Sequence, residues 1–289
     1  MGGGRTRVVA VDLMVSGDHA CLPFDSDDER WAVRAAFTTQ GLARGERVML
    51  FTDPGTSPTA AVSALSEYGV PAERAASTGQ LEVVDETPGY DPARGFAPGA
   101  RVALWSAIRA DAHDRGYTGL RAAGDMAWAA RPDVPPEELA AYEAGLTRLF
   151  RRIGFTALCE YDRRVFPAAV LADLTAAHPL SVLTPVDALH ITRDGPLLTL
   201  VGSADLATRP DFDRALHTAL TPSPPLTALR TLDLTGLTFL DAHCAATLLR
   251  HPAPSPRHPP LTVLCTAAQL RMLQVCGASE ADGLSFWVR

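Results

Sequence analysis

The sequence contains no lysine, so all 26 of its basic residues are arginines. A phosphate-binding loop of the Walker type needs a lysine to contact the β- and γ-phosphates, and Schiff-base catalysis needs a lysine amine. The 289 residues therefore exclude both kinds of chemistry.

Long apolar runs and closely spaced cysteine pairs are missing as well. No stretch approaches the roughly 18–20 apolar residues that cross a bilayer, and Met1–Arg7 is not followed by the apolar segment of a secretory signal. The five cysteines are widely spaced and form no Cys-x-x-Cys pair. We therefore predict a cytoplasmic protein with reduced thiols and no membrane partner.

The composition is that of a globular protein, with 47% hydrophobic and 20% charged residues. Domains commonly contain about 100–200 residues, so the length predicts two of them. The formal net charge is −7 and no basic run stands out. Because an acidic chain repels phosphate backbones, we expect no direct binding to nucleic acid.

Strand-like and helix-like patterns alternate along the first part of the chain. Short apolar runs predict strands, and longer stretches with apolar residues on one face predict helices. The predicted strands are 7–15, 47–52, 80–85, 119–124 and 155–161, and the predicted helices are 29–41, 62–68, 102–115, 137–152 and 168–177. A polar loop is predicted for residues 16–28. This alternation is typical of βαβ units around a parallel sheet.

The pattern restarts near residue 182, where we place a domain boundary. Two short apolar runs flank Arg193-Asp194-Gly195, and the Asp-Gly pair predicts a hairpin between them. The remaining predicted elements are a helix at 212–220, a strand at 229–234, a helix at 245–250, a strand at 261–265 and a helix at 267–276, with proline-rich loops at 222–225 and 252–260. The predicted domains are residues 6–182 and 186–289.

Seven short motifs follow one another in the first domain. They are Asp18-His19-Ala20-Cys21, Gly41–Arg47, Gly79-Gln80-Leu81, Gly119–Trp128, Tyr142-Glu143, Cys159-Glu160-Tyr161-Asp162 and His178-Pro179. In this order they resemble the MEDS family, the methanogen/methylotroph sensory domain of prokaryotic signalling and transcription-control proteins. The resemblance implies a RecA-like parallel sheet without a phosphate loop. It also implies a sensor of small molecules, simple hydrocarbon derivatives among them.

The second domain carries a different set of motifs. Gly202–Leu206, Leu232–Asp241 and the predicted helix Ala267–Cys276 with Gly277 resemble the STAS domain of anti-sigma factor antagonists. The resemblance implies a small α/β domain that binds an anti-sigma factor or a related regulatory protein. In that family a hydroxyl at the start of a helix is phosphorylated by the partner.

The corresponding run here is Asp241-Ala242-His243-Cys244, which contains no hydroxyl. We therefore expect the STAS-like domain to work without a phosphoserine switch. Asp241, His243 and Cys244 are the predicted partner-binding residues. Asp241 is also expected to cap the helix, and for His243 and Cys244 ordinary packing stays an alternative.

Ligands of parallel α/β sheets bind beyond the carboxyl ends of the strands. Together with the MEDS resemblance, this rule predicts one shared pocket with the ligand-binding residues His19, Cys21, Arg121, Asp125, Trp128, Cys159, Glu160, Asp162 and His178. Each has a structural alternative. A buried cysteine packs as a small hydrophobe, an aspartate satisfies turn amides, an arginine pairs on the surface, and a tryptophan lines the core.

A metal or haem site is a second interpretation of the same residues. The imidazoles and thiols of His19, Cys21, Cys159 and His178 would suit zinc, copper or haem iron. Their spacing matches no known metal-binding motif, so no metal is assigned from the sequence. His19 and Cys159 are the residues that would hold one, and the ligand itself is not identified.

The sequence is compatible with three functions. The favoured one is a regulator without enzymatic activity, in which a small molecule binds the MEDS-like domain and the STAS-like domain passes the change to a protein partner. The second is a thiol- or metal-dependent hydrolase built on His19 and Cys159, although no Gly-x-Ser-x-Gly or His-Glu-x-x-His motif is present. The third is an interaction scaffold with a collapsed pocket. The sequence leaves a homo-oligomer open.

Overall fold

The computed structural model describes residues 6–53, 55–84, 96–221, 228–250 and 260–289. The chain divides into two compact units, Met1–Pro185 and Val186–Arg289. In the part of the chain that is described, no helix is both long and apolar enough to cross a membrane.

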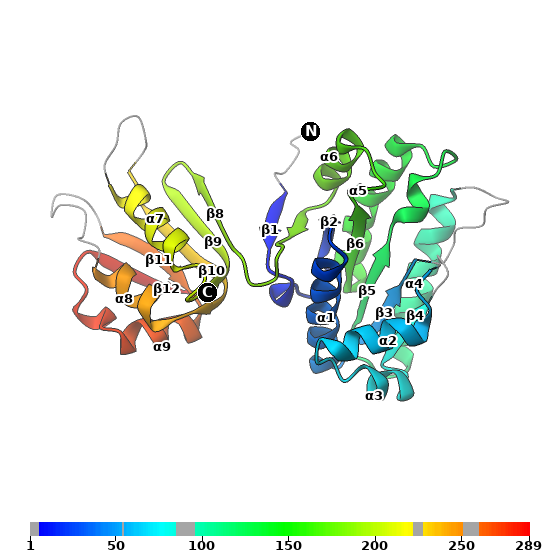
Figure 1. Ribbon diagram of the computed structural model, residues 1–289, viewed down its shortest axis with the longest axis horizontal. Helices are drawn as coiled ribbons and strands as arrows, with labels where there is room; N and C mark the ends of the chain where they lie inside the picture. Colours follow the sequence, from blue (N-terminus) through cyan, green and yellow to red (C-terminus); the bar gives the residue numbers. More distant parts are fainter. Residues whose placement is uncertain (1–5, 54, 85–95, 222–227, 251–259) are drawn as a thin grey trace. The chain divides into compact units, whose positions relative to one another are not determined.

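The first unit is built on a sheet of seven parallel strands (Figure 1). From one edge to the other, the strand order is β1-β7-β2-β6-β5-β3-β4. The bounds are β1 Arg7–Val9, β2 His19–Phe24, β3 Arg47–Phe51, β4 Leu81–Val84, β5 Leu120–Asp125, β6 Phe155–Asp162 and β7 Leu180–Val182. Because β2, β6 and β5 are central, both of their faces are covered, as is usual in parallel sheets.

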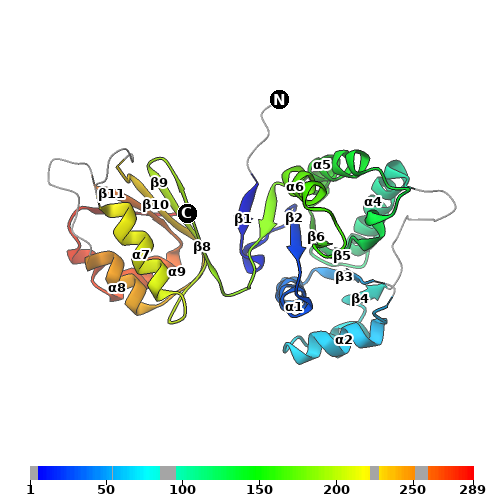
Figure 2. The same cartoon turned by 45° about the horizontal axis from the view of Figure 1, so that its top comes forward.

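Helices cover both faces of this sheet. Figure 2 shows α1 and α2 on one side and α4, α5 and α6 on the other. The bounds are α1 Asp27–Ala43, α2 Pro58–Glu67, α3 Ala72–Ser77, α4 Pro98–Asp114, α5 Pro136–Ile153 and α6 Ala168–Ala177, with short 3-10 helices at Val11–Leu13 and Ala127–Ala130. Successive side chains of a strand point to opposite faces. Cys159 and Tyr161 of β6 therefore lie in the core beneath α5, whereas Glu160 lies against α1.

The beginning of the chain differs from the prediction. The strand predicted for 7–15 ends at Val9, and the loop predicted for 16–28 contains the central strand β2. Asp18, His19 and Pro23 gave that segment its polar, loop-like pattern. The side chain of His19 is buried, however, and β2 pairs with β6 on one side and β7 on the other. The short strand β7 was not predicted either.

The second unit contains a mixed sheet of five strands in the order β12-β11-β10-β9-β8. Only β8 and β9 are antiparallel, and they form the predicted hairpin. The bounds are β8 Leu189–Asp194, β9 Leu197–Ala204, α7 Arg209–Leu220, β10 Thr231–Leu240, α8 Ala242–Arg250, β11 Leu261–Cys265, α9 Ala267–Val275, a 3-10 helix Ala278–Glu280 and β12 Leu284–Val288. The three α-helices and the sheet bury one common core.

The predicted α/β class, a parallel sheet followed by a smaller α/β unit, is confirmed. The strand β12 was not predicted, and the strand predicted at 229–234 stops six residues before the end of β10. Asp85, the proline-rich segment predicted at 222–225 and all but the last residue of the one predicted at 252–260 lie outside the described residues.

Candidate functional site

Four polar side chains meet in the interior of the first unit. They are His19 at the start of β2, Glu143 on α5, Cys159 in the middle of β6 and His178 between α6 and β7. All four are buried, and each offers a donor atom within 4.8 Å of the donor atoms of the others. We call these four residues the polar cluster.

The register of the strands explains why residues so far apart in the sequence meet here. His19 is aligned with Ala157 of β6, so Cys159 lies on the same face two residues further along. Ala20 is aligned with Leu180 of β7, which places His178 beside His19. The rings of His19 and His178 have their centres 4.3 Å apart.

Glu143 reaches the cluster from the buried face of α5. Leu139, Leu146 and Phe150 lie on the same face, at the i, i+3, i+4 spacing of an apolar stripe. Glu143 is thus a carboxylate in the middle of that stripe, and its side chain has no exposed surface.

The contacts within the cluster centre on Glu143. Its Oε2 lies 3.2 Å from Nε2 of His19 and 3.5 Å from Nε2 of His178. The Sγ of Cys159 lies 3.4 Å from Nε2 of His19 and 3.7 Å from Oε2 of Glu143. The other carboxylate oxygen, Oε1, accepts a hydrogen bond of 3.2 Å from the hydroxyl of Tyr161.

Both histidine rings are held from outside the cluster. Nδ1 of His19 lies 3.0 Å from Oγ1 of Thr147. Nδ1 of His178 lies 2.7 Å from the carbonyl oxygen of Leu174. A carbonyl oxygen only accepts, so Nδ1 of His178 carries the hydrogen and Nε2 faces the cluster.

The dry environment shifts the pKa values of the cluster. Burial lowers the pKa of His19 from 6.5 to about 4, which outweighs the opposing effect of Glu143. Burial alone would raise the pKa of Glu143, but the rings of His178 and His19 beside its carboxylate bring it well below its usual value. Burial and the nearby Glu143 raise the pKa values of Cys159 and Tyr161 well above their usual ranges. At neutral pH the interior therefore holds a carboxylate, a thiol and a neutral His19.

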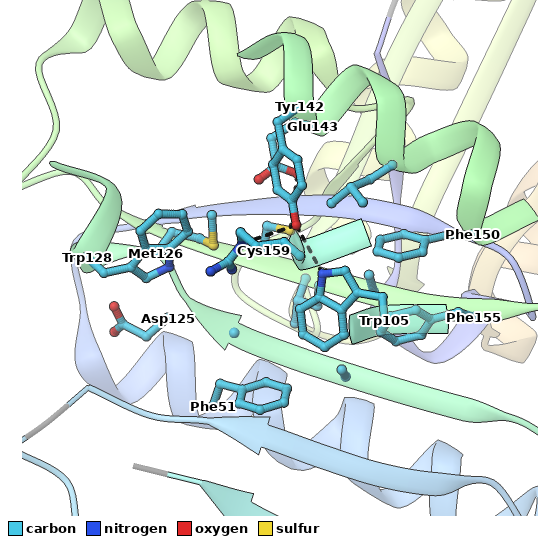
Figure 3. Close-up of a pocket in the computed structure, with 16 residues that line it drawn as sticks. Phe51, Trp105, Asp125, Met126, Trp128, Tyr142, Glu143, Phe150, Phe155 and Cys159 are labelled. Carbon is cyan, nitrogen blue, oxygen red and sulfur yellow. Dashed lines mark hydrogen bonds between the residues drawn. The ribbon is translucent and has the colours of Figure 1, made fainter. Parts of the chain in front are cut away.

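A cavity adjoins the cluster (Figure 3). The volume that the centre of a water-sized sphere can occupy in it is about 40 Å³. By the same measure, a single water molecule needs roughly 10–15 Å³. Its walls are mostly apolar and include Phe51, Trp105, Ala122, Met126, Leu146, Phe150, Phe155 and Ala157. Glu143 and Cys159 give it a polar end.

A second polar group lines the same cavity. The hydroxyl of Tyr142 accepts hydrogen bonds from Nε1 of Trp105 (3.0 Å) and Nε of Arg101 (3.3 Å), shown as dashed lines in Figure 3. The guanidinium of Arg101 also lies over the ring of Trp128, 4.2 Å from its centre. Burial raises the pKa of Tyr142 to about 12, so the hydroxyl keeps its proton at neutral pH.

A family model described as the methanogen/methylotroph, DcmR sensory domain (MEDS) matches residues 18–179, more than half of the chain. The chain belongs to the MEDS family. The match begins one residue before His19 and ends one residue after His178, so it encloses the whole polar cluster. Membership indicates a sensory role in signalling or regulation. A search of curated proteins finds no match to the chain.

The predicted shared pocket of the MEDS unit is divided by the sheet. Trp128 and Asp125 line the cavity, but Oδ2 of Asp125 lies 2.8 Å from an Arg30 nitrogen on α1. Glu160 and Arg121 lie against α1 as well. Glu160 pairs with Arg34, and Arg121 with Glu46, each at 2.8 Å. The prediction that Arg121 and Glu160 share a pocket with His19 is therefore wrong.

The last two predicted ligand residues lie outside the cluster too. Asp162 accepts hydrogen bonds from Arg164 near the surface, so its placement in the pocket is wrong. Cys21 is fully buried and aligned with Cys159 in the neighbouring strand, but contributes no atom to the cluster. Tyr142, Glu143 and Tyr161 belong to the MEDS-like motifs but were not predicted as ligand-binding residues. Thr147, Arg101 and Trp105 were not singled out from the sequence at all.

The beginning of α1 in the MEDS unit is not suited to phosphate. A helix that follows a central strand commonly binds phosphate at its N-terminus. Here the hydroxyl of Ser26 caps the helix by accepting from the Glu29 amide. Asp27, Asp28 and Glu29 fill the first turn, and their carboxylates repel anions, in agreement with the missing Walker lysine.

In the second unit the predicted partner-binding residues lie at the start of α8. Asp241 caps the helix, with its Oδ1 2.7 Å from the amide of Cys244, and its Oδ2 is bound by Arg209 at 2.7 Å. The side chain of His243 is 44% exposed, with Nε2 3.9 Å from Asp213. Cys244 is fully buried in the core, so its prediction as a surface contact is wrong.

Proposed function

We propose that the MEDS unit senses a small, mostly apolar molecule that binds in the cavity beside the polar cluster. The observation that carries this proposal is a cavity whose walls are apolar and whose one end presents Glu143 and Cys159. Sites of this kind bind ligands through apolar contact and orient them with a few polar groups. The limited volume favours a molecule of a few heavy atoms.

The polar groups of the cavity further restrict the chemistry of the ligand. The hydroxyl of Tyr142 and the side chains of Glu143 and Cys159 can each contact one polar group of a ligand. Arg101 and Asp125 also line the cavity, and its other walls are mostly hydrocarbon surface. A short alkyl chain with one hydroxyl or carbonyl group fits this distribution. Such a molecule is a simple hydrocarbon derivative, the class that the MEDS resemblance implies.

A binding role fits the cluster better than nucleophilic catalysis. In a catalytic triad, the histidine contacts the nucleophile through one ring nitrogen and the carboxylate through the other. Here Cys159 and Glu143 both approach Nε2 of His19, and Nδ1 lies against Thr147. The thiol is also buried, and its raised pKa keeps it protonated and weakly nucleophilic.

We propose further that the second unit is a STAS-like output domain that binds an anti-sigma factor or a related regulator. The strand β10 leads directly into α8, and Asp241 fixes the first turn of that helix. Phe239, 54% exposed, precedes this turn on β10, and Leu206, 75% exposed, follows the neighbouring strand β9. These apolar side chains and His243 are the proposed contact surface. Because residues 241–244 contain no hydroxyl that could be phosphorylated, the signal that controls partner binding would come from ligand binding in the MEDS unit.

Calorimetric titration of the full chain with short-chain alcohols and ketones tests the ligand proposal. Ala122→Val adds volume inside the cavity, whereas Ala123→Val adds the same volume on the opposite face of β5, at an equally buried position outside the cavity. We expect at least one probe to bind the wild type and Ala123→Val, and to bind Ala122→Val at least 10-fold more weakly. No binding by any probe, or equal binding by both variants, would contradict the proposal.

Pairwise binding assays against the anti-sigma factors of the source genome test the output proposal. Phe239→Asp places a charge on the proposed contact surface. Val165→Asp, on the MEDS unit and 47% exposed, is the matched control. We expect one anti-sigma factor to bind the wild type and the control but not Phe239→Asp. The proposal is overturned when none binds, or when the two variants behave alike.

A further inference from the structure

We propose that His19, Glu143, Cys159 and His178 bind one divalent transition-metal ion, zinc(II) or an ion of similar coordination chemistry, at the polar end of the cavity. The assignment deepens the proposed function, because the ion would be part of the surface that a small molecule contacts. It does not depend on the identity of that molecule.

The residue types and their spacing match a tetrahedral site. Imidazole, thiolate and carboxylate are the ligands of zinc, with about 2.0–2.2 Å to nitrogen or oxygen and about 2.3 Å to sulfur. Tetrahedral angles then place neighbouring donor atoms about 3.3–3.6 Å apart. Four donor pairs in the cluster are separated by 3.2, 3.4, 3.5 and 3.7 Å. The two remaining pairs, those of His178 with His19 and with Cys159, lie within 4.8 Å, so an ion would draw these atoms closer together.

His178 supplies an independent observation. Its Nδ1 hydrogen is donated to Leu174, so in the neutral ring Nε2 presents a lone pair toward Oε2 of Glu143. Nε2 is buried and has no hydrogen-bond partner among the residues that the structure describes. Two acceptors that face each other in a dry interior repel unless a cation lies between them. A proton would relieve this single contact, whereas a metal ion would bind all four donors.

The charges also balance around such an ion. A divalent cation is neutralised by the carboxylate of Glu143 and the thiolate of Cys159, with both imidazoles neutral. This arrangement removes the cost of a net charge in an apolar interior. Binding would release the Cys159 proton, as metal binding to thiols does.

The surroundings of the cluster resemble the outer shell of metal sites. Metal-bound histidines usually engage their second ring nitrogen with a carbonyl, carboxylate or hydroxyl group, which fixes the ring. His178 is held by the Leu174 carbonyl and His19 by Thr147. Tyr161 donates to the second oxygen of Glu143, which leaves Oε2 to face the other three donors.

Cobalt(II) titration of the metal-free full chain tests the site, with no organic probe present. We expect one cobalt(II) per chain, strong visible bands of tetrahedral cobalt, an ultraviolet thiolate-to-cobalt band, and loss of all of them when zinc(II) is added. Cys159→Ser should remove the thiolate band. The matched control Cys21→Ser, also buried and aligned with Cys159 in the next strand, should keep it.

A conservative variant separates the metal site from folding effects. Thr147→Val leaves all four ligands in place but removes the hydroxyl beside His19, and should weaken zinc(II) binding about 10–100-fold with an unchanged cobalt spectrum. The proposal is overturned when a wild type that is folded by circular dichroism binds no cobalt(II). It is also overturned when the thiolate band survives in Cys159→Ser or disappears in Cys21→Ser. Because no organic molecule is added, a failure of the small-molecule proposal leaves these results unaffected.

Discussion

Nε2 of His178 lies 3.5 Å from Oε2 of Glu143, and neither side chain has exposed surface. Glu143 comes from a helix and His178 from the segment before a strand at the other end of the MEDS unit's sequence. The carboxylate of Glu143 thus contacts His178, His19 and Cys159, the three other members of the polar cluster.

Glu143→Gln should destabilise the metal-free protein by about 1–3 kcal/mol, because the buried carboxylate lies within hydrogen-bond reach of Tyr161 and His19 and a neutral amide satisfies these groups less well. Urea unfolding at pH 7 with a chelator measures the change. Glu138→Gln, exposed on the same helix, should alter the free energy of unfolding by no more than ~0.5 kcal/mol. Equal effects of the two substitutions would contradict the described burial of Glu143.

The stability of the metal-free protein should fall as the pH is lowered from about 6.5 to 4. Burial lowers the pKa of His19 to about 4, so the unfolded chain takes up a proton at a pH where the folded chain does not. The stabilisation is complete above the unfolded pKa and is lost progressively as the pH approaches 4. The total loss in the free energy of unfolding due to His19 is on the order of 3 kcal/mol.

His19→Gln removes this titration. Its free energy of unfolding, measured from pH 7 to 4 in the presence of a chelator, should change less steeply than that of the wild type. The contribution of Glu143 is lost mainly below this window, because the loss begins near the usual carboxyl pKa and continues down to its lowered value. Parallel curves for wild type and variant would show that His19 titrates normally.

One thiol per folded chain should react quickly with an aromatic disulfide reagent. All five cysteines are free, and Cys276 is the one that is not buried. Burial raises the pKa of the thiols of Cys21, Cys159 and Cys265, and raises that of Cys244 to about 12. Cys276→Ser should abolish the fast phase. Two or more fast thiols in the wild type would contradict the burial of Cys159.

Arg121→Met should destabilise the MEDS unit without touching the ligand site. Its guanidinium is fully buried against α1 and bonded to Glu46 at 2.8 Å. Loss of one partner of such a pair costs about 3–5 kcal/mol, and the double variant Arg121→Met with Glu46→Met should recover part of it. Cobalt(II) affinity should stay within about 3-fold of the wild type. A large loss of cobalt(II) affinity with unchanged stability would indicate that Arg121 is part of the ligand site.

Regular elements with clear periodicity were predicted well from the sequence. The helix at 168–177 and the strand at 261–265 have the predicted bounds, and α5 differs from its prediction by one residue at each end. These segments combine an apolar pattern with clear ends. β2 was missed because His19 and Pro23 interrupt its apolar run, and β7 and β12 because three and five residues carry little periodic signal.

The candidate site was only partly predictable, for a physical reason. Strand polarity indicates which residues lie at one end of a sheet, but the alternation of side chains decides which face they occupy. That alternation places Glu160 against α1 and Cys159 beneath α5. The signal that could have found Glu143 was present, since a carboxylate on the apolar stripe Leu139–Leu146–Phe150 of an amphipathic helix points into the core.

Native mass spectrometry of the full chain, purified without chelator from the cells that naturally make it, shows whether the polar cluster and its cavity form the ligand site of this MEDS domain. We predict a mass excess of a transition-metal ion, a small organic molecule or both, retained in Ala123→Val and Cys21→Ser. The organic component should be lost from Ala122→Val, and the metal from Cys159→Ser. A bare chain mass in every variant, or a bound species retained by all four variants, would contradict the account.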